Sequence, residues 1–263
     1  MLKGIDVSSW QNEMDFSNYD FVIIKASEGC NWVDPGLNRH FNKLAGNASG
    51  EPLTDKLYGF YHYARPELGE TPEAEAEWFV KLVGHHKGHA LYALDWEGTS
   101  LEYSPEWALR WLKHVYKLTG VKPVIYLQGS EAIKEKYKII SDSDFGLWVA
   151  HWGVDTPMFN NWKFYALHQY QGTPLDKNYF NGDSKAWKMY AGKIQLDPLP
   201  TKLSIKEGDV VKVISRTDFN KVVNDPWVLR ATFDVIEVDG DRVVIGKGGT
   251  VSGVWNAKNL TKV

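Results

Sequence analysis

The sequence contains a single cysteine, Cys30, among its 263 residues. An intramolecular disulfide is therefore excluded, and because no Cys-His signature surrounds Cys30, we expect a small buried hydrophobic residue rather than a nucleophile. The histidines lack the spacing of a metal site, and the cluster His85, His86 and His89 is typical of a solvated loop. We therefore expect neither a metal nor another cofactor.

The chain also lacks a run of about 18 apolar residues, so no membrane span is expected. Its first residues, 1–7, have no apolar core like that of a signal peptide and already resemble a strand. The expectation is a protein made in the cytoplasm that leaves the cell, if it does, by a route it does not encode. A formal net charge of -3 argues against a nucleic-acid binder.

Aromatic residues, in contrast, are abundant. They make up 14% of the chain, with 12 Trp and 13 Tyr. Large amphipathic rings stack on the apolar faces of sugars, although a large β-rich core also uses them. The composition therefore favours a carbohydrate ligand and leaves a purely structural use open.

The first 180 residues alternate strand-like apolar runs with helical stretches. Helices are predicted to begin at Thr71-Pro72 and at Ser104-Pro105, and the second to end at Gly120. This alternation indicates an α/β fold, an incomplete (β/α)8-like barrel of about eight strands with helices mainly around the first five. The predicted strands are 3–7, 21–26, 58–63, 90–96, 123–127, 146–151, 164–170 and 175–178.

Two carboxylates stand where the buried strand 90–96 ends. Side chains at i and i+2 share one face of a strand, so the Cβ atoms of Asp95 and Glu97 are expected about 6.5 to 7 Å apart. Burial beside a like charge raises the pKa of one carboxyl, and glycoside hydrolysis needs one protonated and one ionised carboxyl. The alternative for such a pair is a solvated turn.

Other polar residues also stand at strand ends. The carboxyl ends of barrel strands meet at one mouth, where four carboxylates are expected to converge: Asp6, Asp95, Glu97 and Asp176. This joint arrangement favours a catalytic site. Further residues at these ends are Lys25, Glu28, Tyr61, Tyr126, Trp148 and Gln169.

A second domain is predicted after a short stiff linker, 193–202, which contains two prolines. The first domain then spans 1–192 and the second 203–263. The second is all β, with strands at 209–215, 228–237, 242–247 and 250–255, and suggests a small barrel. At least two of Trp227, Phe233 and Trp255 are expected in its core; a ligand groove is the alternative.

Six blocks resemble the successive strand motifs of glycoside hydrolase family 25, the muramidases often called Chalaropsis-type lysozymes. The tail from Ser204 resembles the SH3-like wall-binding modules of phage lysins, through its strand pattern and GDRVVIG at 240–246. The six blocks are GIDVSSWQ (4–11), KASEG (25–29), DP (34–35), GFYHY (59–63), LDWE (94–97) and WVA (148–150).

The resemblance implies hydrolysis of the β-1,4 bond between N-acetylmuramic acid and N-acetylglucosamine in peptidoglycan. Glu97 would be the general acid, Asp95 its partner, and Asp6 and Asp176 the flanking carboxylates. We further expect a monomer without a nucleic-acid or membrane partner, which, like an endolysin, reaches the bacterial cell wall after release. Sugar contacts would come from Tyr61, Tyr126 and Trp148, and polar contacts from Lys25, Glu28 and Gln169.

The stereochemical outcome stays open. Retaining enzymes hold their carboxyls at about 5 to 5.5 Å and inverting ones at about 6.5 to 9.5 Å, and the strand estimate falls near this boundary. We favour a third route, in which the substrate's own 2-acetamido oxygen attacks while Asp95 orients that group. The competing functions are a sugar-binding barrel without catalysis and a hydrolase of another N-acetylated polymer such as chitin.

Overall fold

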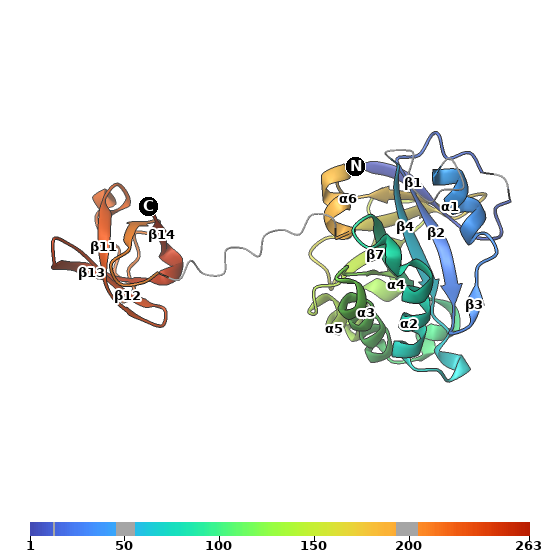
Figure 1. Ribbon diagram of the computed structural model, residues 1–263, viewed down its shortest axis with the longest axis horizontal. Helices are drawn as coiled ribbons and strands as arrows, with labels where there is room; N and C mark the ends of the chain where they lie inside the picture. Colours follow the sequence, from blue (N-terminus) through green and yellow to red (C-terminus); the bar gives the residue numbers. More distant parts are fainter. Residues whose placement is uncertain (13, 46–55, 193–204) are drawn as a thin grey trace. The chain divides into compact units, whose positions relative to one another are not determined.

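The computed structural model describes residues 1–12, 14–45, 56–192 and 205–263. The chain divides into two compact units, Met1–Gln195 and Leu196–Val263, drawn in Figure 1. The predicted linker 193–202 lies outside the described residues. The domain limits expected there therefore stay predictions.

The first unit contains a closed barrel of eight strands, as the sequence predicts (Figure 1). Strand β1 pairs with both β2 and β9, which closes the ring, and the short β3 (Trp32–Val33) extends β2 as a hairpin. Strands β1 to β8 of the ring are parallel, whereas β9 runs antiparallel to both of its neighbours. The ring follows the order β1 (Leu2–Val7), β2 (Phe21–Glu28), β4 (Leu57–Tyr63), β5 (Ala90–Asp95), β6 (Val124–Gln128), β7 (Gly146–Ala150), β8 (Leu167–Gln171) and β9 (Lys177–Phe180).

The helices largely follow the expected distribution. In the described part of the chain no helix follows β1, and α6 follows the last strand, which the sequence did not predict. Asp183 caps α6 by accepting a hydrogen bond from Ala186 N at 2.8 Å, and Trp187 packs on Phe21 inside the barrel at 4.7 Å between ring centres. The helices are α1 (Leu37–Ala45), α2 (Pro72–Val83), α3 (Pro105–Thr119), α4 (Gly129–Ala132), α5 (Lys138–Ser141) and α6 (Ser184–Tyr190), with 3-10 turns at Pro66–Leu68, Gly84–His86, Gly98–Glu102 and Glu135–Tyr137.

The two main helices begin where the sequence predicts. The side chain of Thr71 accepts a hydrogen bond from Ala74 N at 3.2 Å, and that of Ser104 accepts one from Glu106 N at 3.3 Å. Each cap satisfies a backbone donor that the first helical turn leaves unpaired. Gly120 ends α3 with φ of 73°, a left-handed conformation that glycine adopts at low cost.

Strand periodicity divides the apolar residues into two layers. One layer packs against the helices and includes Ile24, Leu94 and Trp111. The other fills the barrel interior and includes Leu91 and Ala93. Because side chains alternate along a strand, the position that follows Leu91 and Ala93 on the interior face is Asp95.

The second unit is an antiparallel sheet of five strands in the order β13-β12-β11-β10-β14. Phe233 and Trp255 are buried in its core, whereas Trp227 is 56% exposed, so two of the three aromatic residues are core as expected. The strand predicted at 228–237 begins only at Thr232, because Pro226–Leu229 forms a 3-10 turn capped by the Asp225 side chain. Closure of this sheet into a small barrel stays a prediction. Its strands are β10 (Val210–Val213), β11 (Thr232–Asp239), β12 (Arg242–Lys247), β13 (Thr250–Asn256) and β14 (Leu260–Lys262), with a 3-10 turn at Ala257–Asn259.

Candidate active site

A pocket of ≈ 260 Å³ opens at the carboxyl ends of the parallel strands. All four predicted carboxylates line it, together with four of the predicted sugar and polar contacts. Trp152, which follows β7, was not predicted from the sequence. The lining residues are Asp6, Tyr61, Asp95, Glu97, Tyr126, Trp148, Trp152, Gln169 and Asp176.

Asp176 reaches this mouth by a route that the sequence analysis did not foresee. It was expected at the carboxyl end of the last strand, but it immediately precedes β9 (Lys177–Phe180). Because β9 is antiparallel to β1 and β8, its first residue lies at the end where the parallel strands finish. Asp6 N donates a hydrogen bond to the Asp176 carbonyl oxygen at 3.2 Å, which joins the two segments.

Two amide side chains hold the Asp6 carboxylate. Its Oδ2 accepts hydrogen bonds from Gln169 Nε2 at 3.0 Å and from Asn178 Nδ2 at 2.6 Å. Trp148 Nε1 donates to Asn178 Oδ1 at 2.8 Å, and since an indole N–H only donates, this bond sets which way the Asn178 amide points. Asn178 was missed by the sequence analysis, although its place two residues beyond Asp176 puts it on the same strand face.

Asp95 and Glu97 are the two carboxylates at the end of β5. Asp95 is buried, and its Oδ1 has no hydrogen-bond partner among the described groups. Desolvation raises the pKa of Asp95 well above its usual range, with the negative charge of Glu97 as the next cause. Desolvation and then Asp6 raise the pKa of Glu97, while Lys25 opposes both shifts. The pair therefore retains a proton to higher pH than an isolated carboxyl does.

The pKa values of the other two carboxylates, Asp6 and Asp176, are also raised. Desolvation raises the pKa of Asp6 to about 6, against the opposing hydrogen bonds from Gln169 and Asn178. Desolvation also raises the pKa of Asp176 to about 7, with added repulsion from Asp6 and Glu97. The mouth thus concentrates four acids that resist ionisation, a condition for proton donation near neutral pH.

Lys25 and Glu28 lie outside the set of pocket-lining residues. Lys25 Nζ pairs with Glu28 Oε2 at 2.8 Å and lies 4.8 Å from the ring centre of Tyr63 and 5.2 Å from that of Trp32. Arg65 pairs with the second oxygen of Glu28. Lys25 and Glu28, which were predicted as polar contacts to the sugar, therefore pair with each other. Lys25 influences the pocket through its charge, which lowers the pKa of Asp95 and Glu97.

A serine, a histidine and a glutamate form a hydrogen-bonded chain elsewhere in the barrel wall. Ser27 Oγ lies 2.9 Å from His62 Nδ1, and His62 Nε2 lies 2.8 Å from Glu75 Oε2. The order resembles that of a nucleophilic triad. All three side chains are fully buried, so no substrate reaches them. These hydrogen bonds instead connect α2 to β2 and β4.

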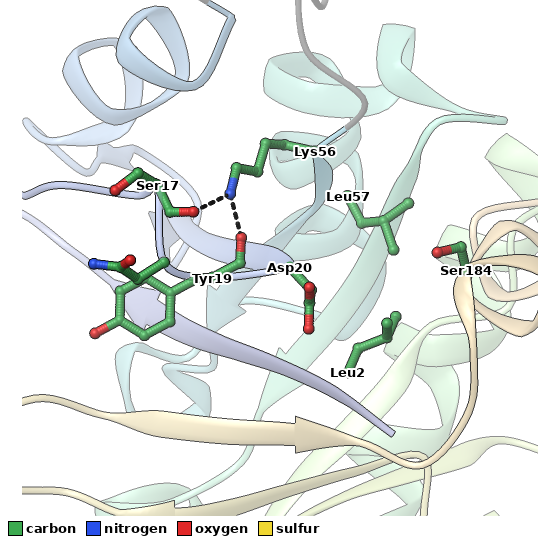
Figure 2. A pocket seen from close by; sticks show the side chains of 8 residues that line it. Leu2, Ser17, Tyr19, Asp20, Lys56, Leu57 and Ser184 are labelled. Carbon is green, nitrogen blue, oxygen red and sulfur yellow. Dashed lines mark hydrogen bonds between the residues drawn. The ribbon is translucent and has the colours of Figure 1, made fainter.

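Another hollow, of ≈ 390 Å³, lies at the amino ends of β1, β2 and β4 (Figure 2). Figure 2 shows the Lys56 ammonium directed at two backbone carbonyl oxygens, those of Ser17 at 2.9 Å and of Tyr19. Asp20 is the only carboxylate among the described residues that line it. Those residues therefore do not supply the paired acids that hydrolysis of a glycosidic bond requires.

None of the described helices is long and apolar enough to span a membrane. Within the described ranges, no three His, Cys, Asp or Glu side chains are grouped as metal ligands would be. An eight-stranded barrel with carboxyls that converge at its carboxyl-end mouth fits a glycoside hydrolase, which needs a pair of carboxyl groups at the cleaved bond.

Comparison with known proteins gives the family. Residues 5–178 match the model of glycosyl hydrolases family 25, and the chain belongs to this family. It is 29% identical over 219 residues to the uncharacterized protein YegX of Escherichia coli, covering 75% of this chain and 76% of that one. It is 28% identical over 218 residues to lysozyme M1 of Streptomyces globisporus, covering 70% and 69%. The fold matches the muramidase structure from Acremonium alcalophilum with a TM-score of 0.60 and 24% identity, over 74% of this chain and 100% of that one.

Proposed function

We propose that the protein is a muramidase that cleaves the β-1,4 bond between N-acetylmuramic acid and N-acetylglucosamine in peptidoglycan, with Glu97 as general acid and Asp95 as its partner. The observation that carries the proposal is the buried, unpartnered Oδ1 of Asp95 beside the raised pKa of Glu97. A buried acceptor without a donor is costly, so a ligand N–H that fills it binds strongly. The 2-acetamido group of the substrate supplies such an N–H.

The proposed reaction has two steps. Glu97 gives its proton to the leaving O4 of N-acetylglucosamine, while the acetamido carbonyl oxygen attacks the anomeric carbon and the glycosidic C–O bond breaks. Asp95 accepts the acetamido N–H and stabilises the positive charge of the cyclic intermediate. The Glu97 carboxylate then takes a proton from water, which opens the ring at the anomeric carbon and leaves muramic acid with its configuration retained.

Asp6 and Asp176 complete the acidic mouth in this mechanism. The charge of Asp6 raises the pKa of Asp95, Glu97 and Asp176, whereas the charge of Asp176 raises the pKa of the Tyr61 and Tyr126 hydroxyls. Tyr61, Tyr126 and Trp148 line the pocket and are the proposed sugar contacts, with Tyr61 and Trp148 in a T-shaped contact at 6.3 Å between ring centres.

The second unit is proposed to be an SH3-like module that binds the cell wall, as in a phage-type endolysin. Tethering to the polymer raises the effective concentration of the catalytic unit near its substrate. Residues 1–195 alone are then expected to digest isolated wall fragments normally and whole cells more slowly. Equal rates on whole cells would contradict a targeting role.

The test of the proposed function is mass spectrometry of the fragments released from purified peptidoglycan, with chitin digested in parallel. New reducing ends at muramic acid, and little release from chitin, are expected. Reducing ends at glucosamine, free peptides, or chitin as the better substrate would overturn the assignment. NMR of the first product tests the mechanism, because an inverted anomer is incompatible with attack by the acetamido group.

A further inference from the structure

Trp152 is a large exposed side chain at the rim of the acidic pocket. It lines the pocket and is 57% exposed, an unusual state for a tryptophan in a folded domain. Its main chain is fixed on β8 from both sides, since His151 N donates to the Gln169 carbonyl oxygen at 3.1 Å and Gly153 N donates to that of Tyr170 at 3.0 Å. The backbone from which the Trp152 side chain extends is therefore held in place.

The edge of the indole is also fixed. Trp152 Nε1 donates to Gln169 Oε1 at 3.0 Å, the same oxygen that accepts from the Tyr126 hydroxyl at 3.1 Å. The amide nitrogen of Gln169 donates in turn to Asp6. Because both groups bonded to Oε1 are donors, the Gln169 amide has one orientation. Gln169 therefore fixes the position of the Trp152 ring relative to Asp6.

One face of the indole rests on Gly172. A Cβ at Gly172 would lie 2.2 Å from Cζ2 of Trp152, 2.5 Å from Cε2 and 2.6 Å from Cη2. These three distances are nearly equal, as they are when an atom lies over the ring face; an approach at the ring edge would leave the flanking atoms much farther away. The absence of a side chain at Gly172 thus makes room for the ring, and the exposed area belongs to the remaining faces and edges.

We propose that Trp152 is a sugar-stacking platform that binds an N-acetylhexosamine ring of the glycan at the rim of the pocket. The inference rests on the proposed function for the identity of the glycan. A rigid indole that is supported beneath and held at its N–H presents its apolar face at low entropic cost. It adds binding energy for the polymer beyond that of the groups at the cleaved bond.

The test measures binding rather than cleavage. Calorimetry gives the Kd of a soluble tetrasaccharide of alternating N-acetylglucosamine and N-acetylmuramic acid for the full chain in a Glu97→Gln background. Trp152→Ala is expected to raise Kd about two- to ten-fold, the range for one aromatic stacking contact. Trp152→Phe keeps a ring face and loses the N–H, so Kd is expected to stay within about two-fold of the parent.

Two further variants check the geometry. Gly172→Ala is expected to raise Kd as Trp152→Ala does, because the added methyl pushes the ring off its support while leaving the indole in place; the Gly172 backbone is not left-handed, so alanine is not strained there. Phe164→Ala is the matched control, an aromatic residue 60% exposed that precedes β8 and so lies toward the opposite end of the barrel. Its Kd is expected to be unchanged.

Each outcome decides the proposal. An unchanged Kd for Trp152→Ala, an equal rise for Trp152→Ala and Trp152→Phe, or no binding by the parent overturns the platform. If the parent binds, the alanine variants weaken binding, and the chain with native Glu97 releases no new reducing ends at muramic acid, then the platform stands and the proposed reaction fails.

Discussion

The two hollows of the barrel differ in both volume and charge, and the smaller one contains more carboxylates. The one at the amino ends of the strands measures ≈ 390 Å³ and the one at the carboxyl ends ≈ 260 Å³, yet the smaller one holds four carboxylates with raised pKa. In the larger one, Lys56 is occupied by backbone carbonyl oxygens. Converging titratable groups, rather than volume, are therefore the basis on which we propose the carboxyl end of the barrel as the reactive end.

Removal of the proposed acid is expected to give the largest difference between the two ends. Glu97→Gln keeps the side-chain shape and loses the transferable proton, so kcat on purified peptidoglycan should fall about 10²- to 10⁴-fold. Reducing-end assays measure this loss. Glu102→Gln, an exposed residue in the following 3-10 turn, is the control and should keep the parent rate.

Asp95→Asn should give the next largest loss, roughly 10²- to 10³-fold in kcat, as for the removal of one preorganised electrostatic group. The amide cannot stabilise the positive charge of the intermediate. Steady-state kinetics on a soluble glycan give the value. A loss confined to KM would show that Asp95 binds substrate without assisting the chemistry.

Asn178→Ala tests the support of Asp6. It removes the 2.6 Å hydrogen bond to a carboxylate, so the pKa of Asp6 should rise further and kcat/KM should fall about ten-fold. The pH profile of kcat/KM is the measurement, because only a change in Asp6 ionisation displaces one of its limbs. A uniform loss at every pH would instead indicate a packing defect.

The substitution Asp176→Asn is expected to change stability. Its expected effect is smaller than the losses of activity above, and it stabilises the protein. The pKa of Asp176 is raised to about 7, so the folded state binds a proton more tightly than the unfolded chain does, and the free energy of unfolding falls as pH rises from about 4 to about 7. Asp176→Asn removes this penalty. At pH 8 it should stabilise the protein by about 1 to 2 kcal/mol, allowing for the partial exposure of the group.

Urea unfolding at several pH values measures this effect. The gain of Asp176→Asn should vanish near pH 3, below the ordinary pKa of 3.8, where the wild-type carboxyl is protonated in the folded state and largely so in the unfolded chain. A gain that is independent of pH would point to a cause other than ionisation.

The other end of the barrel should give the smallest effect on activity. Lys56→Met removes the ammonium that bonds two backbone carbonyls and should cost about 1 kcal/mol of stability. The rate on peptidoglycan should change less than two-fold. A large loss of activity with the fold intact would break the contrast between the two ends.

Local sequence signals were sufficient for much of the fold. The proline and hydroxyl caps at Thr71 and Ser104 gave two helix starts, and strand alternation predicted that Asp95 and Glu97 share one face of their strand. The mouth residues of the parallel strands could be named because such strands all end on one side.

The parts that were missed depend on contacts between distant segments. The antiparallel course of β9 brings Asp176 to the mouth at the beginning of a strand, and pairing with β1 and β8 decides this course. Asn178 and Trp152 act through hydrogen bonds to residues of other strands, and Lys25 and Glu28 satisfy each other, which spacing along one segment does not reveal.

The most direct test of the account compares Glu97→Gln on two β-glycosides of N-acetylmuramic acid that differ only in the leaving group. One carries N-acetylglucosamine through O4, which needs a proton to depart, and the other carries dinitrophenolate, which does not. For cleavage of the glycosidic bond in a single turnover, we predict a loss of about 10²- to 10⁴-fold on the first substrate and a rate near that of the parent on the second, because only the later attack of water needs Glu97 as a base. Equal losses on both would contradict the assignment of Glu97 as the proton donor.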